Sequence, residues 1–204
     1  MSFYTGAIKV LGPAVRFLFG VRKIDGIENI PNGGGLVCAN HTSFADPIVI
    51  AASLKMPVKY MGKAELFKIP VLKSVIKAFG AFPVKRGGAD PGAIRTAETL
   101  LKSGELVGIF PQGTRCPGVP IEEASVKNGA GLIAYRSGCC IIPVYIKTKN
   151  NKVGFFKRTH VIIGKPIENS EFGFTDGTSK EYEMASNRVL ADICALANSA
   201  KENV

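Results

Sequence analysis

The sequence is poor in the residues from which disulfide frameworks and zinc sites are built. Its 204 residues include five cysteines and only two histidines. Five is an odd number, and no two cysteines form a Cys-x-x-Cys pair, so neither a set of disulfides nor a structural zinc site is expected. Cysteines used in this way fit a reducing cytoplasm.

Long hydrophobic runs are absent as well. No apolar run approaches the roughly 20 residues that a membrane-spanning helix needs, so we expect a chain that is not integral to a membrane. The first residues lack the basic region and the long apolar core of a secretory signal. Internal repeats and long linkers are missing too, and with 46% hydrophobic residues the chain can form one substantial core. A single domain is the default expectation.

Acidic residues are scarce relative to basic ones. The chain has 16 acidic and 26 basic residues, a net charge of +10, and the segment from Lys55 to Lys102 holds ten bases and three acids, a net +7. In residues 66–79 the lysines alternate with bulky apolar side chains, a mixture that fits lipid headgroups better than nucleic acid. A solvated helix face is the simpler explanation of a lysine run. We expect an anionic membrane surface as a partner and no nucleic acid.

Residues 3–19 have the pattern of an amphipathic helix with a basic face. Pro13 is expected to kink this helix, and Phe17 and Phe19 widen its apolar side. Such a helix can lie in a membrane interface or pack into the core, and the sequence leaves both open. The apolar positions are Tyr4, Ala7, Ile8, Leu11, Ala14, Val15 and Leu18, with Thr5, Lys9, Gly12 and Arg16 opposite. We expect residues 1–20 to form a membrane-associating helix.

Apolar and amphipathic segments alternate along the rest of the chain. Strands are expected near residues 36–39, 58–61, 80–84, 106–110, 141–147 and 159–163, and helices near 46–54, 70–78, 91–102, 126–137 and 179–199. This alternation predicts an α/β fold, a single domain in which helices flank a mixed central sheet. The strand ends would then gather His41, Arg86 and Arg115 at one edge of the sheet, where ligands bind in such folds.

The stretch Asn40-His41-Thr42-Ser43-Phe44-Ala45-Asp46 carries the strongest chemical signal. It places His41 five residues before Asp46, directly after an expected strand. Ser43 can cap free backbone amides of the helix that follows. If the turn brings Asp46 onto one imidazole nitrogen, the carboxylate fixes the tautomer and the other nitrogen can accept a proton. His41 and Asp46 are the candidate general base and its partner, although a capped turn with a structural histidine has the same pattern.

Two further segments at strand ends suit an anion. Phe110-Pro111-Gln112-Gly113-Thr114-Arg115 offers the guanidinium of Arg115, the hydroxyl of Thr114 and, at Gly113, a backbone that a ligand can approach closely. Residues 80–88 end in the cations Lys85 and Arg86 and a pair of glycines, which can cradle phosphate. Each segment alone could be a solvated turn, but together they indicate a phosphate-binding edge.

These segments resemble the motifs of the glycerolipid acyltransferase family, nearest the lysophosphatidic acid acyltransferases of bacteria. In chain order they are N-H-x-x-x-x-D, a G-x-F-x-x-x-R block, F-P-x-G-T-R and the apolar block Ile141-Ile142-Pro143-Val144. The resemblance runs from about Gly26 to Val144. It implies that His41 is the general base and Asp46 its partner. It also implies that the acceptor phosphate is bound by Arg86, Gly113, Thr114 and Arg115, while the block at Pro143 is associated with the acyl donor and with core structure.

The chain departs from the family pattern at Gln112. The family usually has glutamate before the Gly-Thr-Arg of this motif. Glutamine keeps the size and one acceptor oxygen but loses the negative charge. We therefore expect Gln112 to contact a hydroxyl of the acceptor and to have no acid–base or charge-pairing role.

The resemblance implies that residues 21–204 form an acyltransferase domain that moves a fatty acyl group from a thioester to the free hydroxyl of 1-acyl-glycerol-3-phosphate, giving phosphatidic acid. The thioester, of coenzyme A or acyl carrier protein, would be a co-substrate, and neither a cofactor nor a metal is expected. The partners would be a lysophospholipid, the acyl donor and an anionic membrane, with the enzyme peripheral on the cytoplasmic face.

Other interpretations stay open. The acceptor could be another lipid, such as glycerol-3-phosphate or a lyso-aminolipid, or the chain could be a non-catalytic lipid-binding module. A serine hydrolase with Ser43 as nucleophile is disfavoured, because the sequence has no G-x-S-x-G motif.

Overall fold

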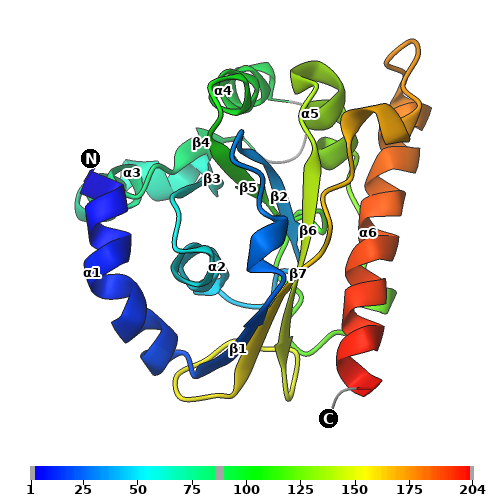
Figure 1. Cartoon of the computed structure of the whole chain (residues 1–204). Helices are drawn as coiled ribbons and strands as arrows, with labels where there is room; N and C mark the ends of the chain where they lie inside the picture. The colour runs from blue at the N-terminus through cyan, green and yellow to red at the C-terminus, as the bar shows by residue number, and fades with distance from the viewer. Residues whose placement is uncertain (1–2, 86–89, 203–204) are drawn as a thin grey trace.

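The structure, a computed structural model, describes residues 3–85 and 90–202. A seven-stranded sheet forms its centre, in the order β1-β7-β6-β2-β5-β3-β4 (Figure 1). β6 and β7 pair antiparallel, and the other neighbouring pairs are parallel. The strands are β1 (Val21–Asp25), β2 (Gly35–Ala39), β3 (Val58–Lys63), β4 (Phe82–Val84), β5 (Leu106–Ile109), β6 (Ile141–Thr148) and β7 (Thr159–Ile163). The predicted α/β fold with a mixed central sheet is confirmed.

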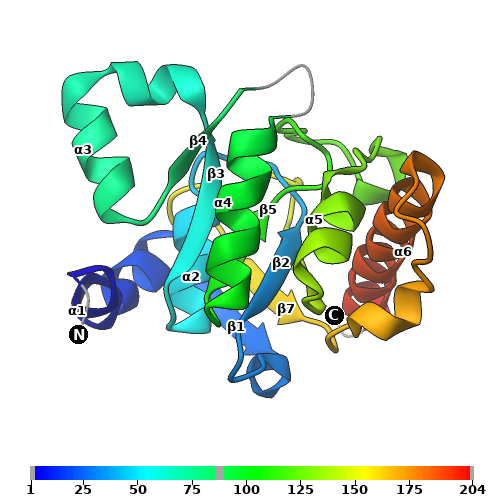
Figure 2. The same ribbon diagram turned by 90° about the horizontal axis from the view of Figure 1, so that it is seen from above.

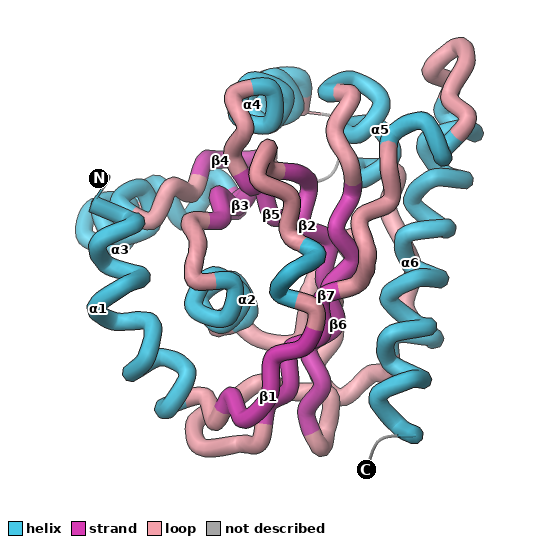
Figure 3. The backbone as a smooth tube through the Cα atoms, viewed as in Figure 1, coloured by secondary structure: helices cyan, strands magenta, loops and turns pink. Residues whose placement is uncertain are grey.

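Helices cover both faces of the sheet and give the domain three layers (Figures 1 and 3). α1 and α2 pack on one face, and α4, α5 and α6 pack on the other. α3 lies beyond the end of the sheet that β3 and β4 form (Figure 2). The helices are α1 (Phe3–Leu18), α2 (Asp46–Leu54), α3 (Pro70–Ala78), α4 (Pro91–Lys102), α5 (Gly129–Ser137) and α6 (Ser179–Glu202).

β2 is the central strand, and its side chains fill both hydrophobic cores. It pairs with β5 on one side and with β6 on the other, and each of its residues is buried. Leu36 and Cys38 belong to the core under α4, α5 and α6, whereas Val37 and Ala39 belong to the core under α1 and α2. A strand buried on both faces is a continuous apolar run in sequence. Because β2, β5 and β6 are parallel, their carboxyl ends meet at one edge of the sheet.

The predicted helices and strands are all present, but several boundaries differ by two or three residues and one strand was not predicted. The helix expected from residue 126 begins at Gly129, because the N–H of Lys127 bonds instead to the carbonyl of Pro111 at 2.8 Å. The strand expected from residue 80 begins at Phe82. β1 was not predicted, because its sequence Val-Arg-Lys-Ile-Asp lacks an apolar run and its only neighbour in the described sheet is β7.

α1 packs against α2 through a narrow buried stripe, which consists of Tyr4, Ile8 and Gly12. A Cβ at Gly12 would lie 4.0 Å from the Cα of Ala52, so the two helices approach closely there. Arg16 follows on the same side and donates a hydrogen bond to the carbonyl of Ala52 at 2.6 Å. The expectation that Gly12 and Arg16 face away from the packed side is therefore wrong.

Part of the expected apolar face of α1 lies in solvent. Leu11 and Leu18 are exposed, as are Phe3, Val10 and Phe17, so the helix packs into the core and also presents apolar side chains outward. Pro13 lies inside the helix without ending it. Among residues 3–85 and 90–202, no helix has the length and apolar character that crossing a membrane requires.

Candidate active site

His41 and Asp46 form a close pair at the carboxyl end of β2. The Nδ1 atom of His41 lies 2.8 Å from the Oδ2 atom of Asp46, whose side chain is fully buried. The same oxygen accepts hydrogen bonds from the backbone N–H groups of Thr42 at 2.6 Å and of Ser43 at 2.8 Å. Because a carboxylate can only accept, this contact places a proton on Nδ1 and leaves Nε2 able to take one.

Ser43 stabilises the turn between His41 and Asp46. Its Oγ accepts a hydrogen bond from the backbone N–H of Ala45 at 3.2 Å. The helix α2 begins at Asp46, and its N-cap, Ala45, makes no side-chain capping bond. The predicted cap is therefore displaced from the helix end into the preceding turn, where the carboxylate of Asp46 already binds two of the backbone amides.

The imidazole of His41 is held flat by an aromatic stack. Its ring lies 3.8 Å from the ring of Phe110 at an interplanar angle of 11°. Phe110 in turn stacks on Tyr60 of β3, at 5.5 Å and 12°. Sequence reasoning gave Phe110 no role. Its position directly after β5 could have indicated this role. Cys38 of β2 pairs with Ile109 of β5, so the residues that follow the two strands lie close together.

The loop after β5 also holds the backbone of His41 from two sides. The Oε1 of Gln112 accepts the N–H of His41 at 2.5 Å, and the N–H of Cys116 donates to the carbonyl of His41 at 2.8 Å. Gln112 is buried. Its side chain also lines the cavity beside His41, so the expected contact with an acceptor hydroxyl stays a prediction.

The Gln112→Leu variant is expected to be less stable than the native protein. Leucine has a similar size but cannot accept the N–H of His41, which would stay buried without a partner, at a cost of about 1–3 kcal/mol in the free energy of unfolding. Gln112→Glu keeps an acceptor at this position and is the matched control. Denaturant unfolding of the three proteins measures the difference. Equal stability of the leucine variant and the native protein would show that the bond contributes nothing.

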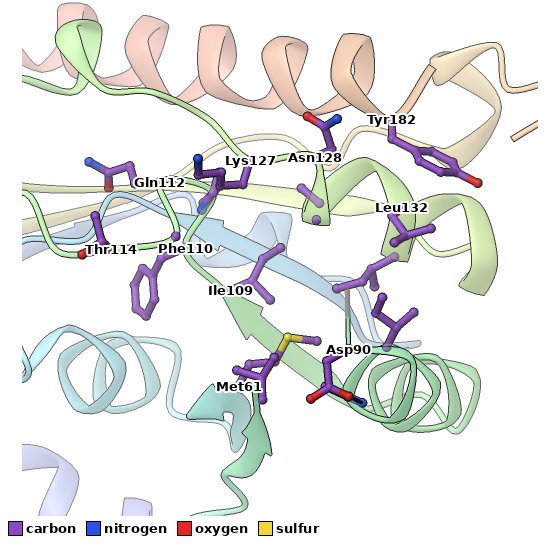
Figure 4. A pocket seen from close by; sticks show the side chains of 18 of the residues that line it. Met61, Asp90, Ile109, Phe110, Gln112, Thr114, Lys127, Asn128, Leu132 and Tyr182 are labelled. Atoms are coloured by element: carbon purple, nitrogen blue, oxygen red, sulfur yellow. Dashed lines mark hydrogen bonds between the residues drawn. The ribbon is translucent and has the colours of Figure 1, made fainter. Parts of the chain in front are cut away.

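A cavity of about 690 Å³ opens beside His41. Its apolar walls come from β3, β5, α4 and α5, and Figure 4 shows Met61, Ile109 and Leu132 converging on it. The cavity extends to Tyr182 near the start of α6. The block at Pro143 is placed differently: Ile141, Ile142 and Val144 are fully buried in β6, which confirms a structural role and leaves the association with the acyl donor as a prediction.

The cavity lining includes three of the five residues expected to bind phosphate. Lys85, Gly113 and Thr114 line the cavity together with His41. Arg115 is exposed, and its guanidinium lies 3.4 Å from the ring centroid of the exposed Phe44. Arg86, the remaining residue of the predicted set, lies outside the described residues.

Lys127 is a cavity cation that sequence reasoning missed. It lines the same space as Gly113 and Thr114 (Figure 4). A Cβ at Gly113 would lie 3.1 Å from the Cγ of Lys127, so the lysine stem runs along that glycine. The hydrogen bond from the N–H of Lys127 to the carbonyl of Pro111 fixes this arrangement. The contact forms because the loop folds back onto Pro111, so the spacing of residues in the sequence does not predict it.

The fold and the site define an α/β enzyme in which a buried carboxylate orients an imidazole beside a largely apolar cavity whose lining includes Lys85 and Lys127. The sequence model of the family described as Acyltransferase matches residues 21–147. The chain belongs to this acyltransferase family, and the expected membership is confirmed.

Three similar proteins are named as acyltransferases of 1-acyl-sn-glycerol-3-phosphate or of 1-acyl-sn-glycerophosphate (LPA). The 1-acyl-sn-glycerol-3-phosphate acyltransferase of Bacillus subtilis (strain 168) is 34% identical over 193 residues, which cover 93% of this chain and 92% of that protein. A chloroplastic 1-acyl-sn-glycerol-3-phosphate acyltransferase of Arabidopsis thaliana is 30% identical over 73% of this chain and 44% of its own length. The crystal structure of the 1-acyl-sn-glycerophosphate (LPA) acyltransferase PlsC from Thermotoga maritima superposes with a TM-score of 0.68 at 26% identity, covering 94% of this chain and 80% of that one.

Proposed function

We propose that this acyltransferase moves a fatty acyl group from an acyl thioester to the free hydroxyl of 1-acyl-glycerol-3-phosphate, giving phosphatidic acid. The observation that carries the proposal is the pair of His41 and Asp46, 2.8 Å apart, beside a largely apolar cavity whose lining includes Lys85 and Lys127. The names of the similar proteins from Bacillus subtilis and Thermotoga maritima support the same acceptor.

In this mechanism His41 acts as the general base. Its Nε2 removes the proton of the acceptor hydroxyl while that oxygen attacks the thioester carbonyl, and Asp46 stabilises the imidazolium that forms. The tetrahedral intermediate then expels the thiolate, which takes the proton back from His41. The acyl–sulfur bond breaks, the new ester bond forms, and the imidazole returns to its neutral state. No covalent intermediate on the enzyme is needed.

The polar part of the cavity lining would bind the acceptor phosphate. Lys85, Lys127 and the hydroxyl of Thr114 line it, and Gly113 at a φ of 70° exposes its backbone there. Arg115, adjacent to Thr114, would add a planar fork of donors suited to phosphate. Arg86 keeps the role that the family resemblance implies.

The Lys127→Met variant is expected to raise the KM for 1-acyl-glycerol-3-phosphate by about 10–100-fold, because a charge-assisted hydrogen bond is lost while the apolar stem beside Gly113 stays. The value of kcat should change little. Lys165→Met, which removes an exposed cation outside the cavity lining, is the control. Steady-state kinetics with the acceptor varied measures both. An unchanged KM for the acceptor in Lys127→Met would remove Lys127 from the phosphate site.

The apolar part of the cavity suits a fatty chain. Met61, Ile109, Leu132 and Ile133 line it, and burying an acyl chain there removes each methylene from water at a gain of roughly 0.8 kcal/mol. An enzyme that receives its lipid from a membrane avoids exposing the chain to water. We therefore propose that the protein works as a peripheral enzyme on the cytoplasmic face of an anionic membrane, with residues 1–20 in contact with it.

Thiol release tests the proposed reaction against its alternatives. With a thiol-reactive dye and an acyl-coenzyme A or acyl carrier protein donor, we expect free thiol to appear only after 1-acyl-glycerol-3-phosphate is added. Release that depends on glycerol-3-phosphate or a lyso-aminolipid instead would change the acceptor. Release without any acceptor would indicate a hydrolase, and no release with any acceptor would indicate a lipid-binding module.

A further inference from the structure

Two consecutive aromatic side chains lie in solvent in the loop between β6 and β7. Phe155 and Phe156 are 67% and 68% exposed. Phe156 has a φ of 55°, a left-handed conformation that bulky side chains adopt only at a cost in free energy. The loop thus holds two large apolar groups outward in a backbone conformation that chain propensity alone does not favour.

The end of α1 fixes this loop. The N–H of Phe156 donates to the carbonyl of Leu18 at 2.6 Å. The ring of Phe156 meets that of Phe17 edge-on at 6.1 Å, and Phe155 stacks on Phe19 at 5.0 Å. Phe17 is itself 69% exposed. Figure 1 shows the end of α1 beside the yellow loop at the lower edge of the molecule. We call the exposed side chains of Phe17, Phe155 and Phe156 the aromatic edge.

The loop that carries Phe155 and Phe156 also contacts the active site. The N–H of Val153 donates to the hydroxyl of Thr42, next to His41, at 3.3 Å. The carbonyl of Asn151 accepts the N–H of Gly118, in the loop that clamps His41, at 3.0 Å. Both loops follow the carboxyl ends of parallel strands. The aromatic edge therefore lies at the same edge of the sheet as His41.

The charge around the aromatic edge is of one sign. The loop sequence Lys149-Asn-Asn-Lys-Val-Gly-Phe-Phe-Lys-Arg158 contains four cations and no acidic residue. All four, Lys149, Lys152, Lys157 and Arg158, are exposed. Near an anionic lipid surface each such cation is attracted by the negative headgroups, and aromatic rings favour the interface between headgroups and acyl chains. The loop combines both requirements within ten residues.

We propose that the aromatic edge inserts into the headgroup region of an anionic bilayer while the cations of the loop bind its surface, so that the active-site cavity opens at the membrane. The proposal rests on the proposed function, because a lysophospholipid acceptor resides in that bilayer. It also revises the role of the N-terminal helix. Since Tyr4, Ile8 and Gly12 of α1 are buried, the helix cannot detach without opening the core, so it would meet the lipid through its exposed apolar side chains while it stays packed.

The absence of tryptophan from the chain allows a direct test. Phe156→Trp introduces a single fluorophore at the aromatic edge, and Met184→Trp introduces one at an exposed position on α6. Vesicles of equimolar phosphatidylglycerol and phosphatidylcholine, free of lysophospholipid, are added to each protein. We expect the emission of the Phe156→Trp variant to shift to shorter wavelength and to be quenched by lipids brominated on their acyl chains. The emission of the Met184→Trp variant should stay unchanged.

A second comparison removes the aromatic groups. The double variant Phe155→Ser, Phe156→Ser is expected to bind these vesicles at least about tenfold more weakly, since two aromatic side chains lose their burial. Met184→Ser, checked like the double variant for a native circular dichroism spectrum, should bind as the native protein does. Vesicles of phosphatidylcholine alone should bind the native protein more weakly than the anionic ones.

Three results would overturn the proposal. The first is an emission spectrum of the Phe156→Trp variant that bound vesicles leave unaffected, and the second is equal vesicle binding by the double variant. The third is a blue shift of the Phe156→Trp variant that grows with protein concentration without lipid, which would indicate a protein interface. Because none of these measurements involves acyl transfer, they are independent of whether the proposed reaction occurs.

Discussion

The His41→Ala variant is expected to transfer acyl groups about 10²–10⁴-fold more slowly than the native protein, the usual loss when a general base is removed. The contact with Asp46 places the single N–H proton of the neutral imidazole on Nδ1. Nε2 is therefore the atom that can take the hydroxyl proton. The loss should fall on kcat, with the KM values for both substrates nearly unchanged. Steady-state acyl transfer at saturating substrates measures it.

The folded state of this variant needs its own control. The imidazole stacks on Phe110, so alanine also leaves a void beside the aromatic ring. His41→Gln fills more of this space without supplying a base, and it should be as inactive as His41→Ala. If either variant, with a native circular dichroism spectrum, kept a rate within a few-fold of the native protein, His41 would not be the base.

Asp46→Asn is expected to lower the rate by a similar factor of about 10²–10⁴, because it removes the buried negative charge that stabilises the imidazolium of His41. The oxygen of asparagine can still accept the N–H groups of Thr42 and Ser43 and so preserve the turn. Because one oxygen, Oδ2, makes all three contacts in the native protein, the asparagine oxygen in its place also accepts the Nδ1 proton of His41. The neutral amide, however, no longer stabilises the positive charge that the ring gains when Nε2 takes the substrate proton. The variant should therefore bind its substrates normally and fail at the proton transfer.

The chain supplies a matched control for this change. Asp25 and His160 form a second pair, with the Nε2 of His160 2.7 Å from the Oδ2 of Asp25, between β1 and β7. Neither residue lines the cavity that holds His41. Asp25→Asn should leave the rate unchanged, because the pair of Asp25 and His160 is expected to have only a structural role. Equal and small effects of Asp25→Asn and Asp46→Asn would contradict the special role of Asp46.

Much of the fold could be predicted because its central elements are locally determined. β2 is an apolar run buried on both faces, and α4 and α6 have helical patterns with clear starts. β1 was not predicted because three of the five residues of Val21–Asp25 are charged and its strand character comes from pairing with β7. The buried stripe of α1 was misassigned for a related reason. Close approach to Ala52 selects Gly12, a small residue that an apolar pattern assigns to the other face.

In the candidate site, too, contacts set by local sequence could be predicted, whereas contacts set by tertiary structure could not. The closeness of His41 and Asp46 follows from five residues of chain and could be predicted from spacing. The stack on Phe110 depends on the register between β2 and β5, and the position of Lys127 depends on a long loop that folds back on Pro111. Such contacts are set by tertiary structure. They also account for the hydrogen bond from the N–H of His41 to Gln112, a contact that was not predicted.

The most direct test of the proposed function is product identification by mass spectrometry. The native protein is incubated with isotopically labelled acyl-coenzyme A or acyl carrier protein thioesters and 1-acyl-glycerol-3-phosphate in anionic micelles. We predict labelled phosphatidic acid, with the label in the newly formed ester and free thiol in equal amount. A folded protein that gives no labelled phosphatidic acid with any donor, or that labels another acceptor instead, would contradict the proposed reaction.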